Sequence, residues 1–388
     1  MFEIIRCVNC LLPSTKPDLH FDDKGICGAC RYQKYYDKIN WEERKNEFHQ
    51  LMDAELKKNR NNNYDCTIAV SGGKDSTYQT YLIKEMGYKA LLLNFEPSYP
   101  TELGKRNLER MRNTYGFDLI ELKKSPTYRK LSRIAFDLIG DHEWPNHVGI
   151  YCWPIQIANN FNIPLTFYGE PRGLIGLGRF ETFVDQGVDE ISREIIEQYC
   201  GLGGLRLTDI MEYDKTLKYK DLIPYRYPES EELKQNIKAI DLGHYFKWDF
   251  EENVKIIKKD GWESAEHITE GSIVNYEDLD CGFMPIHQYF KFIKYGYGRG
   301  TDCASYEIRH NRLTKKDATE LITKHDGYLP KKYFKEFLEY LNIDEEYFYN
   351  TVDKYANPYL FKKDNNGRFI RDDNNDLIAN DVWYNSFK

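Results

Sequence analysis

Residues 71–76 carry the side chains whose types and spacing best fit chemistry on a phosphate. Two adjacent glycines allow positive backbone φ and remove the Cβ atoms that would keep a phosphate at a distance. The N–H groups of such a turn, and of a helix that starts after it, favour an anion at one point. The serine hydroxyls are further donors and the lysine brings a mobile positive charge, so the segment is predicted to bind nucleotide phosphates. Its members are Ser71, Gly72, Gly73, Lys74, Asp75 and Ser76.

Two better-known phosphate loops do not fit this segment. A Walker A loop needs Gly where Ile68 stands and Ser or Thr where Asp75 stands, and the dinucleotide pattern G-x-G-x-x-G is absent. The segment instead resembles the SGGxDS signature of the PP-loop ATP pyrophosphatases, which use ATP to adenylate a carbonyl oxygen and release pyrophosphate. A glycine turn that only joins a strand to a helix is the alternative interpretation.

Four of the nine cysteines form two pairs with metal-ligand spacing. Cys7 and Cys10 form one C-x-x-C pair, Cys27 and Cys30 form the other, and sixteen residues separate the pairs. Each pair can hold one edge of a tetrahedral Zn²⁺, which predicts a zinc ribbon. Four thiolates leave no open coordination position, so the zinc is expected to be structural. The remaining cysteines form no second pair and are interpreted mainly as small buried residues: Cys66, Cys152, Cys200, Cys281 and Cys303.

Length and charge narrow the class of protein. The 388 residues suit two or three domains, and 41% hydrophobic with 30% charged residues suits a soluble globular chain. No apolar run is long enough to span a membrane, and the first residues lack the pattern of a signal peptide, so we expect a cytoplasmic protein without a membrane partner. The net charge of −8 disfavours a broad nucleic-acid face.

Alternating strand and helix patterns place the phosphate segment at the edge of a sheet. Strands are predicted at 65–70, 90–95, 117–122 and 163–168, and helices at 76–87, 101–115, 126–139 and 150–161. This alternation predicts an α/β fold with a parallel sheet, in which ligands lie beyond the carboxyl ends of the strands. The rule brings the phosphate segment together with Asn94, Phe95, Gly169 and Glu170.

The chain is predicted to have three parts. Residues 1–62 form the zinc ribbon and a helical connector, and residues 63–215 form the ATP-binding domain. Residues 216–388 form a mainly helical substrate or partner region that ends in a polar tail, because strand signals fade after residue 215 and aromatic helical patterns replace them.

Several stretches together resemble one family, the N-acetyl sugar amidotransferases of bacterial surface-polysaccharide and nonulosonic-acid pathways. The resemblance covers most of the chain up to about residue 330 and is strongest at 292–302. It implies an adenine nucleotide α-hydrolase-like PP-loop domain. The matching stretches are the two cysteine pairs, 71–76, 151–154, 169–170, 245–249, 292–302, 307–309, 313–318 and 326–327.

The resemblance implies a reaction. ATP adenylates the oxygen of a sugar N-acetyl group, pyrophosphate leaves, and ammonia then displaces AMP to give an acetamidino group. The charge that develops on pyrophosphate would be stabilised by Lys74 and by Mg²⁺, with Asp75 as the magnesium contact. Asn94 and Phe95 would contact adenine and ribose, while Gly169 would permit close approach of the nucleotide.

The resemblance also implies roles for the substrate and for a partner. The guanidinium of Arg299 offers a planar fork for phosphate or carboxylate, and Asp302 could hold sugar hydroxyls or the incoming amine. The substrate would be an N-acetylated sugar or nucleotide sugar. Ammonia would come from a separate glutaminase subunit, because the second residue is Phe2 rather than a nucleophilic cysteine and no nucleophile elbow with cysteine is evident.

Other interpretations stay open. Arg299 and Asp302 could form a structural pair at a glycine-bent helix junction. Cys152 could be activated at a helix start or could be a buried structural thiol. The strongest rival function is a PP-loop tRNA thiolase with zinc knuckles, although such enzymes tend to use additional paired cysteines and RNA binding normally leaves a basic surface.

Overall fold

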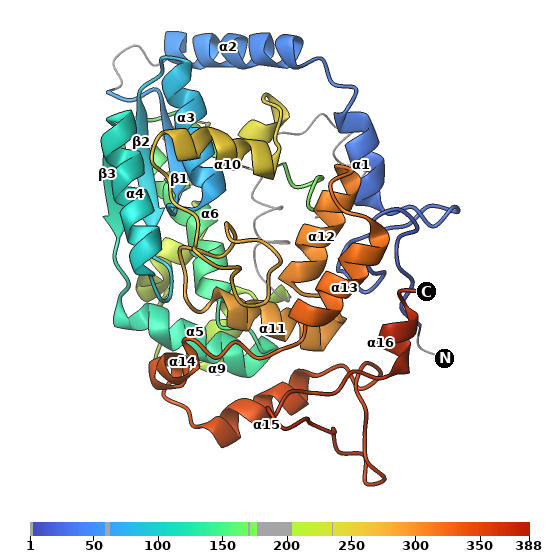
Figure 1. The fold of residues 1–388 in the computed structure, drawn as a ribbon. Helices are drawn as coiled ribbons and strands as arrows, with labels where there is room; N and C mark the ends of the chain where they lie inside the picture. Colours follow the sequence, from blue (N-terminus) through green and yellow to red (C-terminus); the bar gives the residue numbers. More distant parts are fainter. Residues whose placement is uncertain (1–2, 59–62, 170, 177–203, 235) are drawn as a thin grey trace.

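The core of the protein is a five-stranded parallel sheet with the strand order β3-β2-β1-β4-β5 (Figure 1). The computed structural model describes residues 3–58, 63–169, 171–176, 204–234 and 236–388. The strands are β1 (Cys66–Val70), β2 (Ala90–Phe95), β3 (Asp118–Leu122), β4 (Leu165–Tyr168) and β5 (Lys238–Asp241).

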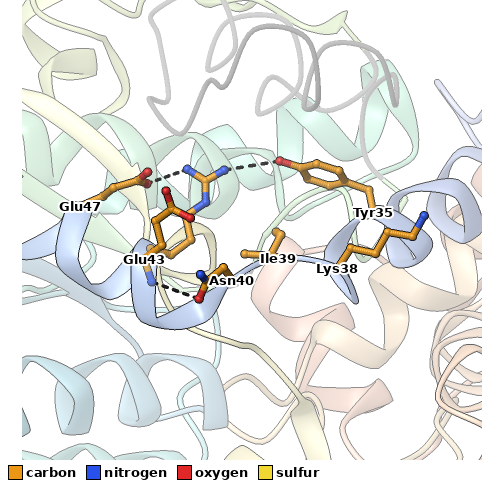
Figure 2. A pocket seen from close by; sticks show the side chains of 7 residues that line it. Tyr35, Lys38, Ile39, Asn40, Glu43 and Glu47 are labelled. Atoms are coloured by element: carbon orange, nitrogen blue, oxygen red, sulfur yellow. Dashed lines mark hydrogen bonds and ion pairs between the residues drawn. The ribbon is translucent and has the colours of Figure 1, made fainter.

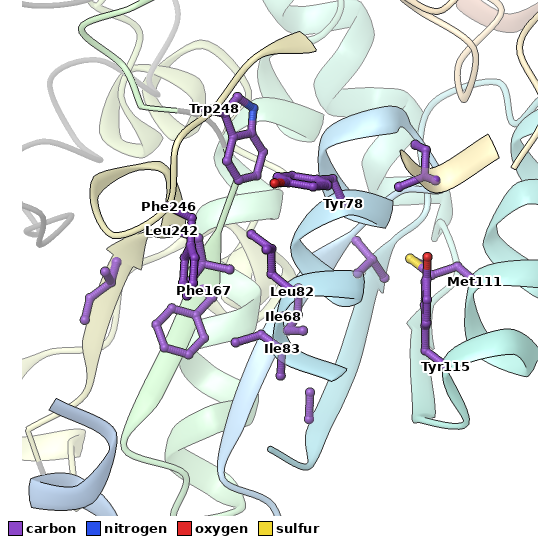
Figure 3. Packing of buried hydrophobic residues seen from close by; sticks show 14 of the residues in the cluster. Ile68, Tyr78, Leu82, Ile83, Met111, Tyr115, Phe167, Leu242, Phe246 and Trp248 are labelled. Carbon is purple, nitrogen blue, oxygen red and sulfur yellow. The ribbon is translucent and has the colours of Figure 1, made fainter. Parts of the chain in front are cut away.

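Helices cover both faces of this sheet because successive residues of its central strands point to opposite sides. Leu91 and Leu93 of β2 pack with α5 (Pro126–Ile139) and α6 (Trp144–Asn160). Leu92 packs on the opposite face with α3 (Lys74–Glu85) and α4 (Glu102–Tyr115). Figure 3 shows this second face, where the labelled side chains of β1, α3, α4 and β4 meet Leu242, Phe246 and Trp248 from beyond β5.

The four strands and four helices predicted in this domain are all present, with two differences. α6 begins at Trp144, six residues before the prediction, so Cys152 lies inside the helix with its side chain buried and not at a helix start. β5 was not predicted, and it comes from the segment expected to be helical. Its four residues pair in parallel with β4 from Leu165 to Tyr168, and two interior apolar residues are too few for a recognisable strand pattern.

The region after residue 280 forms a helical layer with its own aromatic core. Phe283, Phe290, Phe337 and Phe348 are fully buried in this core, which is stabilised by edge-to-face ring contacts. The helices of this region are α11 (Met284–Tyr295), α12 (Arg299–Arg309), α13 (Lys315–His325), α14 (Phe334–Leu341), α15 (Glu345–Tyr355) and α16 (Asp381–Asn385).

The polar tail is an ordered part of this layer. Antiparallel bridges join Phe361 to Ala379 and Lys363 to Phe369, so the polar run lies at the turn of a small hairpin. The α16 residue Trp383 then donates its indole N–H to the Gly296 carbonyl at 2.8 Å. The composition of the tail therefore reflects an exposed turn that is fixed at both ends.

The N-terminal segment lies against the C-terminal helices and not against the sheet. Its backbone accepts a hydrogen bond at the Val8 carbonyl from Lys315 Nζ of α13 at 2.8 Å, and Arg6 Nε donates to Ser386 Oγ at 2.8 Å. In Figure 1 this segment and α1 stand beside α12 and α13, and α2 then crosses to the sheet, where Phe48 and Met52 are buried. The predicted connector is the pair α1 (Gly28–Tyr36) and α2 (Trp41–Lys58).

Shorter elements link β4 to the C-terminal layer. They are α9 (Leu207–Tyr213), η3 (Tyr219–Tyr225), η4 (Ser230–Glu232), η5 (Leu242–His244) and α10 (Phe250–Lys259).

Within the described residues, no helix combines the length and the apolar character that crossing a bilayer requires.

Candidate functional site

The 71–76 loop joins β1 to α3 at the carboxyl edge of the sheet, where the sequence places it. The N–H groups of Ser71 and Gly72 both donate to Ser76 Oγ at 3.2 Å, and the N–H of Gly73 donates to Ser71 Oγ at 3.3 Å. The loop donors therefore converge on a small volume that their own hydroxyl oxygens occupy. A phosphate oxygen could replace a hydroxyl there and accept the same hydrogen bonds.

Gly72 fixes the position of the loop against α4. Its φ is +88°, and a Cβ at this position would lie 2.6 Å from the Gly104 carbonyl oxygen and 2.9 Å from the Leu108 backbone nitrogen. The indole N–H of Trp262 donates to the Gly72 carbonyl oxygen at 3.0 Å. Only glycine fits here, because both the dihedral angle and the close backbone approach exclude a side chain.

Lys74 and Asp75 are held by partners that lie far away in the sequence. Lys74 Nζ is 2.5 Å from Asp75 Oδ2 and 2.7 Å from Glu277 Oε1, and only 4% of Lys74 is exposed. The indole N–H of Trp248 donates to Asp75 Oδ1 at 3.0 Å. Asp75 thus accepts from two donors in the structure, and Trp248, which is also buried in the core, orients a loop carboxylate.

The residues predicted at the other strand ends are placed differently from one another. A Cβ on Gly169 would lie 3.3 Å from the Asp75 Cβ, so the end of β4 meets the loop as expected. Asn94 donates from Nδ2 to the Val70 carbonyl at 2.8 Å and ties β2 to the end of β1. Phe95 packs its ring into the core so closely that a Cβ on Gly149 would overlap it. Glu170 lies outside the described residues.

An acidic segment, residues 277–280, lies over the loop and was not recognised in the sequence. Burial opposes charge on Glu277, but Lys74 and Arg299 outweigh it and lower the pKa of Glu277. Burial raises the pKa of Asp280 to about 6, and a hydrogen bond with Ser71 of the loop partly offsets this effect. The backbone of Asp280 is held by Thr101, whose N–H donates to the Asp280 carbonyl at 3.1 Å. Carboxylates with such different pKa values beside one phosphate-type loop are typical of functional sites.

Arg299 belongs to this network, whereas Asp302 faces the N-terminal segment. Arg299 Nη2 lies 3.1 Å from Asp278 Oδ1 and its Nη1 lies 4.0 Å from Glu277 Oε2. The carboxylate of Asp302 is bound by Lys16 Nζ at 2.8 Å and by Lys291 Nζ at 2.7 Å. The two residues are therefore not paired with each other, and each has a separate set of partners.

The glycines on either side of Arg299 donate backbone hydrogen bonds to the buried carboxyl group of Asp326. It accepts from the N–H groups of Gly298 at 2.8 Å and Gly300 at 2.9 Å, and from the Thr301 hydroxyl at 2.6 Å. A Cβ on Gly298 or Gly300 would approach Asp326 Oδ1 to 2.7 or 2.6 Å. The N-terminus of α12 is thus already bound by an acidic side chain from within the chain.

A second buried polar cluster lies behind the acidic segment. Ser98 Oγ donates a hydrogen bond to Glu143 Oε1 and lies 3.4 Å from Cys281 Sγ. His142 Nε2 lies 3.0 Å from the same oxygen of Glu143. Burial and the charge of Glu143 raise the pKa of the Cys281 thiol. Cys281 is therefore a neutral buried thiol, in agreement with its interpretation from sequence.

The four N-terminal cysteines form the group of metal-ligand type. All four thiols are buried and their sulfur atoms lie within 4.8 Å of one another. The Cys7–Cys30 and Cys10–Cys27 sulfur distances are 3.8 Å and 3.5 Å. A tetrahedral metal with bonds to sulfur of about 2.3 Å requires sulfur–sulfur distances of about 3.8 Å, so the cluster fits a tetrathiolate site. Elsewhere in the described chain no such group of ligands occurs, and Cys200 lies outside it.

Two surface hollows stand out beside these clusters. One, of about 280 Å³, lies between α1 and α2 (Figure 2) and contains no predicted site residue; it is lined by Tyr35, Lys38, Ile39, Asn40, Glu43, Arg44 and Glu47. The other, of about 570 Å³, is open and ends at Tyr276, directly before the acidic segment; it is lined by Glu266, His267, Ile268, Ile273, Val274, Asn275 and Tyr276. Neither hollow is lined by a residue that the sequence predicts for the site.

The fold and the loop define the protein as an α/β protein with a phosphate-type loop after the first strand of a parallel sheet. Residues 270–372 match the family described as "LPS biosynthesis protein WbpG-like, C-terminal domain". The matched segment includes the acidic segment 277–280. It also includes Arg299, Asp302 and Asp326. No curated protein matches the chain by sequence.

Two solved structures are among those similar to the chain. NMN synthetase from Francisella tularensis is 11% identical over 71% of this chain and 94% of its own, with a TM-score of 0.28. The U34-tRNA thiolase NcsA from Methanococcus maripaludis, solved with its [4Fe-4S] cluster, is 12% identical over 86% of this chain and 92% of its own, with a TM-score of 0.31. Likeness at this level carries no argument about function.

Proposed function

We propose that this protein is an ATP-dependent amidotransferase that converts the N-acetyl group of a sugar into an acetamidino group during synthesis of a bacterial surface glycan. Lipopolysaccharide O-antigen, capsule or a flagellin glycan would be the product's destination. One observation carries the proposal: the segment that matches the WbpG-like domain supplies Glu277, which lies 2.7 Å from Lys74 of the phosphate-type loop. This contact supports a single site built from the loop, as the ATP-binding part, and from the WbpG-like segment.

The proposed reaction has two balanced steps. A lone pair of the amide oxygen attacks the α-phosphorus of ATP, a new P–O bond forms, and pyrophosphate leaves with the electrons of the broken bond. Ammonia then attacks the activated carbon, the C–O bond breaks, and AMP departs with the former amide oxygen while one proton is lost from nitrogen. The product is an acetamidino sugar. No redox reagent is needed, because only phosphoryl and acyl-type transfers occur.

The residues divide this work between them. The loop N–H groups and Lys74 would hold the pyrophosphate portion, where negative charge increases in the first step. Mg²⁺, when bound, would neutralise this charge, and Asp75 with the nearby carboxylates provides the oxygen ligands that it prefers. Asp280 lies beside Ser71 and its pKa of about 6 suits a group that exchanges protons near neutral pH. Arg299, reached through Glu277 and Asp278, would face the sugar side.

Further features of the proposal concern the metal, the ammonia and the arrangement of the chain. Zn²⁺ is proposed for the four cysteines, because it favours closed tetrathiolate sites. The ammonia source would be a separate glutaminase subunit, and the protein would work in the cytoplasm where ATP is abundant. The ribbon, the nucleotide domain and the C-terminal region are proposed as the three parts, with β5 added to the nucleotide domain.

The test uses the purified full-length protein with ATP, Mg²⁺, ammonium and a panel of N-acetylated sugars and nucleotide sugars. Mass spectrometry should detect a product in which NH replaces the carbonyl oxygen, with AMP and pyrophosphate formed in equal amounts. Lys74→Met should lower the rate by about 10²–10³, the usual cost of losing one stabilising donor. Lys84→Met is the matched control, because Lys84 is an exposed lysine on the same helix. AMP release that requires tRNA and a sulfur donor would refute the proposal and favour thiolation.

A further inference from the structure

We propose that Lys16, carried by the loop between the two cysteine pairs, is a positioning residue that holds Asp302 and α12 in place, so that the cysteine-bound metal organises the sugar side of the site. This inference rests on the proposed function for its kinetic part only. The zinc ribbon would then be a component of the active centre and more than a device for folding the N-terminus.

The first observation is the burial of the Lys16 contact. Lys16 Nζ lies 2.8 Å from Asp302 Oδ1, and only 5% of its side chain is exposed. The ammonium group also lies 5.2 Å from the centre of the Tyr297 ring. A surface loop of this composition would normally keep its lysines in water. Lys16 instead reaches inward, to a carboxylate whose other oxygen is bound by Lys291.

A second observation is that the ribbon contacts α12 at two places, and that the start of the same helix contacts the acidic segment. At the C-terminal end of α12, Ile308 packs against the cysteine cluster. In the first turn, Asp302 binds Lys16. At the N-terminal end, Arg299 contacts Asp278 and Glu277, and Glu277 in turn contacts Lys74 of the loop.

The geometry links the metal site to the phosphate-type loop through one rigid element. The closed tetrathiolate geometry fixes the loop that carries Lys16, because both of its ends are at metal ligands. Each oxygen of Asp302 keeps a further lone pair after binding one lysine, so the carboxylate can still accept a sugar hydroxyl. Loss of Lys16 would leave this carboxylate with one cation and would let the first turns of α12 move.

The experiment compares three variants of the full-length protein. Lys16→Met removes the ammonium group, Lys16→Arg keeps a cation, and Lys24→Met is the matched control because Lys24 is an exposed lysine in the same loop. Bound zinc is measured by elemental analysis, and amide hydrogen exchange is followed over residues 299–309 without any substrate. KM for the sugar and for ATP are then measured separately.

We expect Lys16→Met to keep its zinc, to exchange the amides of α12 at least tenfold faster, and to raise KM for the sugar about tenfold with KM for ATP unchanged, since a charge-assisted contact is lost. Lys16→Arg should restore most of the wild-type behaviour, and Lys24→Met should match the wild type. Removal of zinc from the wild type with a chelator should also accelerate exchange in α12.

Three outcomes would overturn the inference: unchanged exchange and KM in Lys16→Met, loss of zinc from this variant, or no effect of chelation on α12. If Lys16→Met does not fold, Lys16→Arg and the chelation experiment decide the question. If the wild type forms no amidine product with any sugar, the proposed function fails, but the exchange measurements still decide whether the ribbon holds α12.

Discussion

Gly72→Ala tests whether the phosphate-type loop is fixed by its contact with α4. Gly72 and Gly87 both have positive φ, +88° and +78°, so alanine at either position costs about 1–2 kcal/mol of backbone strain. A Cβ at position 72 also lies 2.6 Å from the Gly104 carbonyl oxygen, whereas nothing lies within 4 Å of a Cβ at position 87. Forcing backbone apart in a packed region adds about 1–3 kcal/mol.

The free energy of unfolding should therefore fall by about 1–2 kcal/mol in Gly87→Ala and by about 2–5 kcal/mol in Gly72→Ala. Denaturant titration measures this difference, and calorimetry measures ATP binding to each variant. ATP affinity should weaken at least tenfold in Gly72→Ala, because the loop N–H groups no longer converge, and should be unchanged in Gly87→Ala. Equal losses of stability in the two variants, or normal ATP binding by Gly72→Ala, would refute the reasoning.

Three further substitutions test individual contacts. Burial raises the pKa of Asp280 from 3.8 to about 6, so the folded state resists its ionisation above about pH 6 and bears no such cost below about pH 4. In thermal unfolding without ligands, Asp280→Asn should be more stable than the wild type by up to about 3 kcal/mol at high pH, a gain that disappears between pH 6 and 4. Asp326→Ala leaves the N–H groups of Gly298 and Gly300 and the Thr301 hydroxyl without their acceptor and should cost about 3–5 kcal/mol in denaturant titration; a loss under 1 kcal/mol would contradict this role. Trp248→Phe removes the donor to Asp75 and should lower kcat with little change in sugar KM, as steady-state kinetics would show; an equal fall in Lys84→Met would contradict it.

The sheet was predictable because its signals are local. The apolar run of β2 lies between two clear helix patterns, and the glycine pair after β1 marks the loop by residue type alone. The cysteine pairs were equally clear, since their spacing is itself the geometry of the metal edge. In contrast, β5 has only Ala239 and Ile240 between charged ends, and its strand state depends on pairing with β4.

The rest of the candidate site depends on contacts between distant segments. Residues 277–280 resemble an ordinary acidic loop in sequence, but the fold brings Glu277 to within hydrogen-bond distance of Lys74, about two hundred positions earlier. The glycines at 298 and 300 suggested a bent helix junction from sequence, but they did not reveal that Asp326 packs against both of them. One sequence signal for the missed carboxylates was available. Three acidic residues, Glu277, Asp278 and Asp280, lie shortly before the 292–302 stretch that carries the family resemblance.

The most direct test of the central claim follows one oxygen atom. A substrate sugar labelled with ¹⁸O in its N-acetyl carbonyl is turned over with ATP, Mg²⁺ and ammonium, and the AMP is examined by mass spectrometry. The account predicts that each AMP carries one ¹⁸O, because the amide oxygen bonds to the α-phosphorus and leaves with it. Unlabelled AMP, or ADP in place of AMP, would contradict adenylation of the amide oxygen.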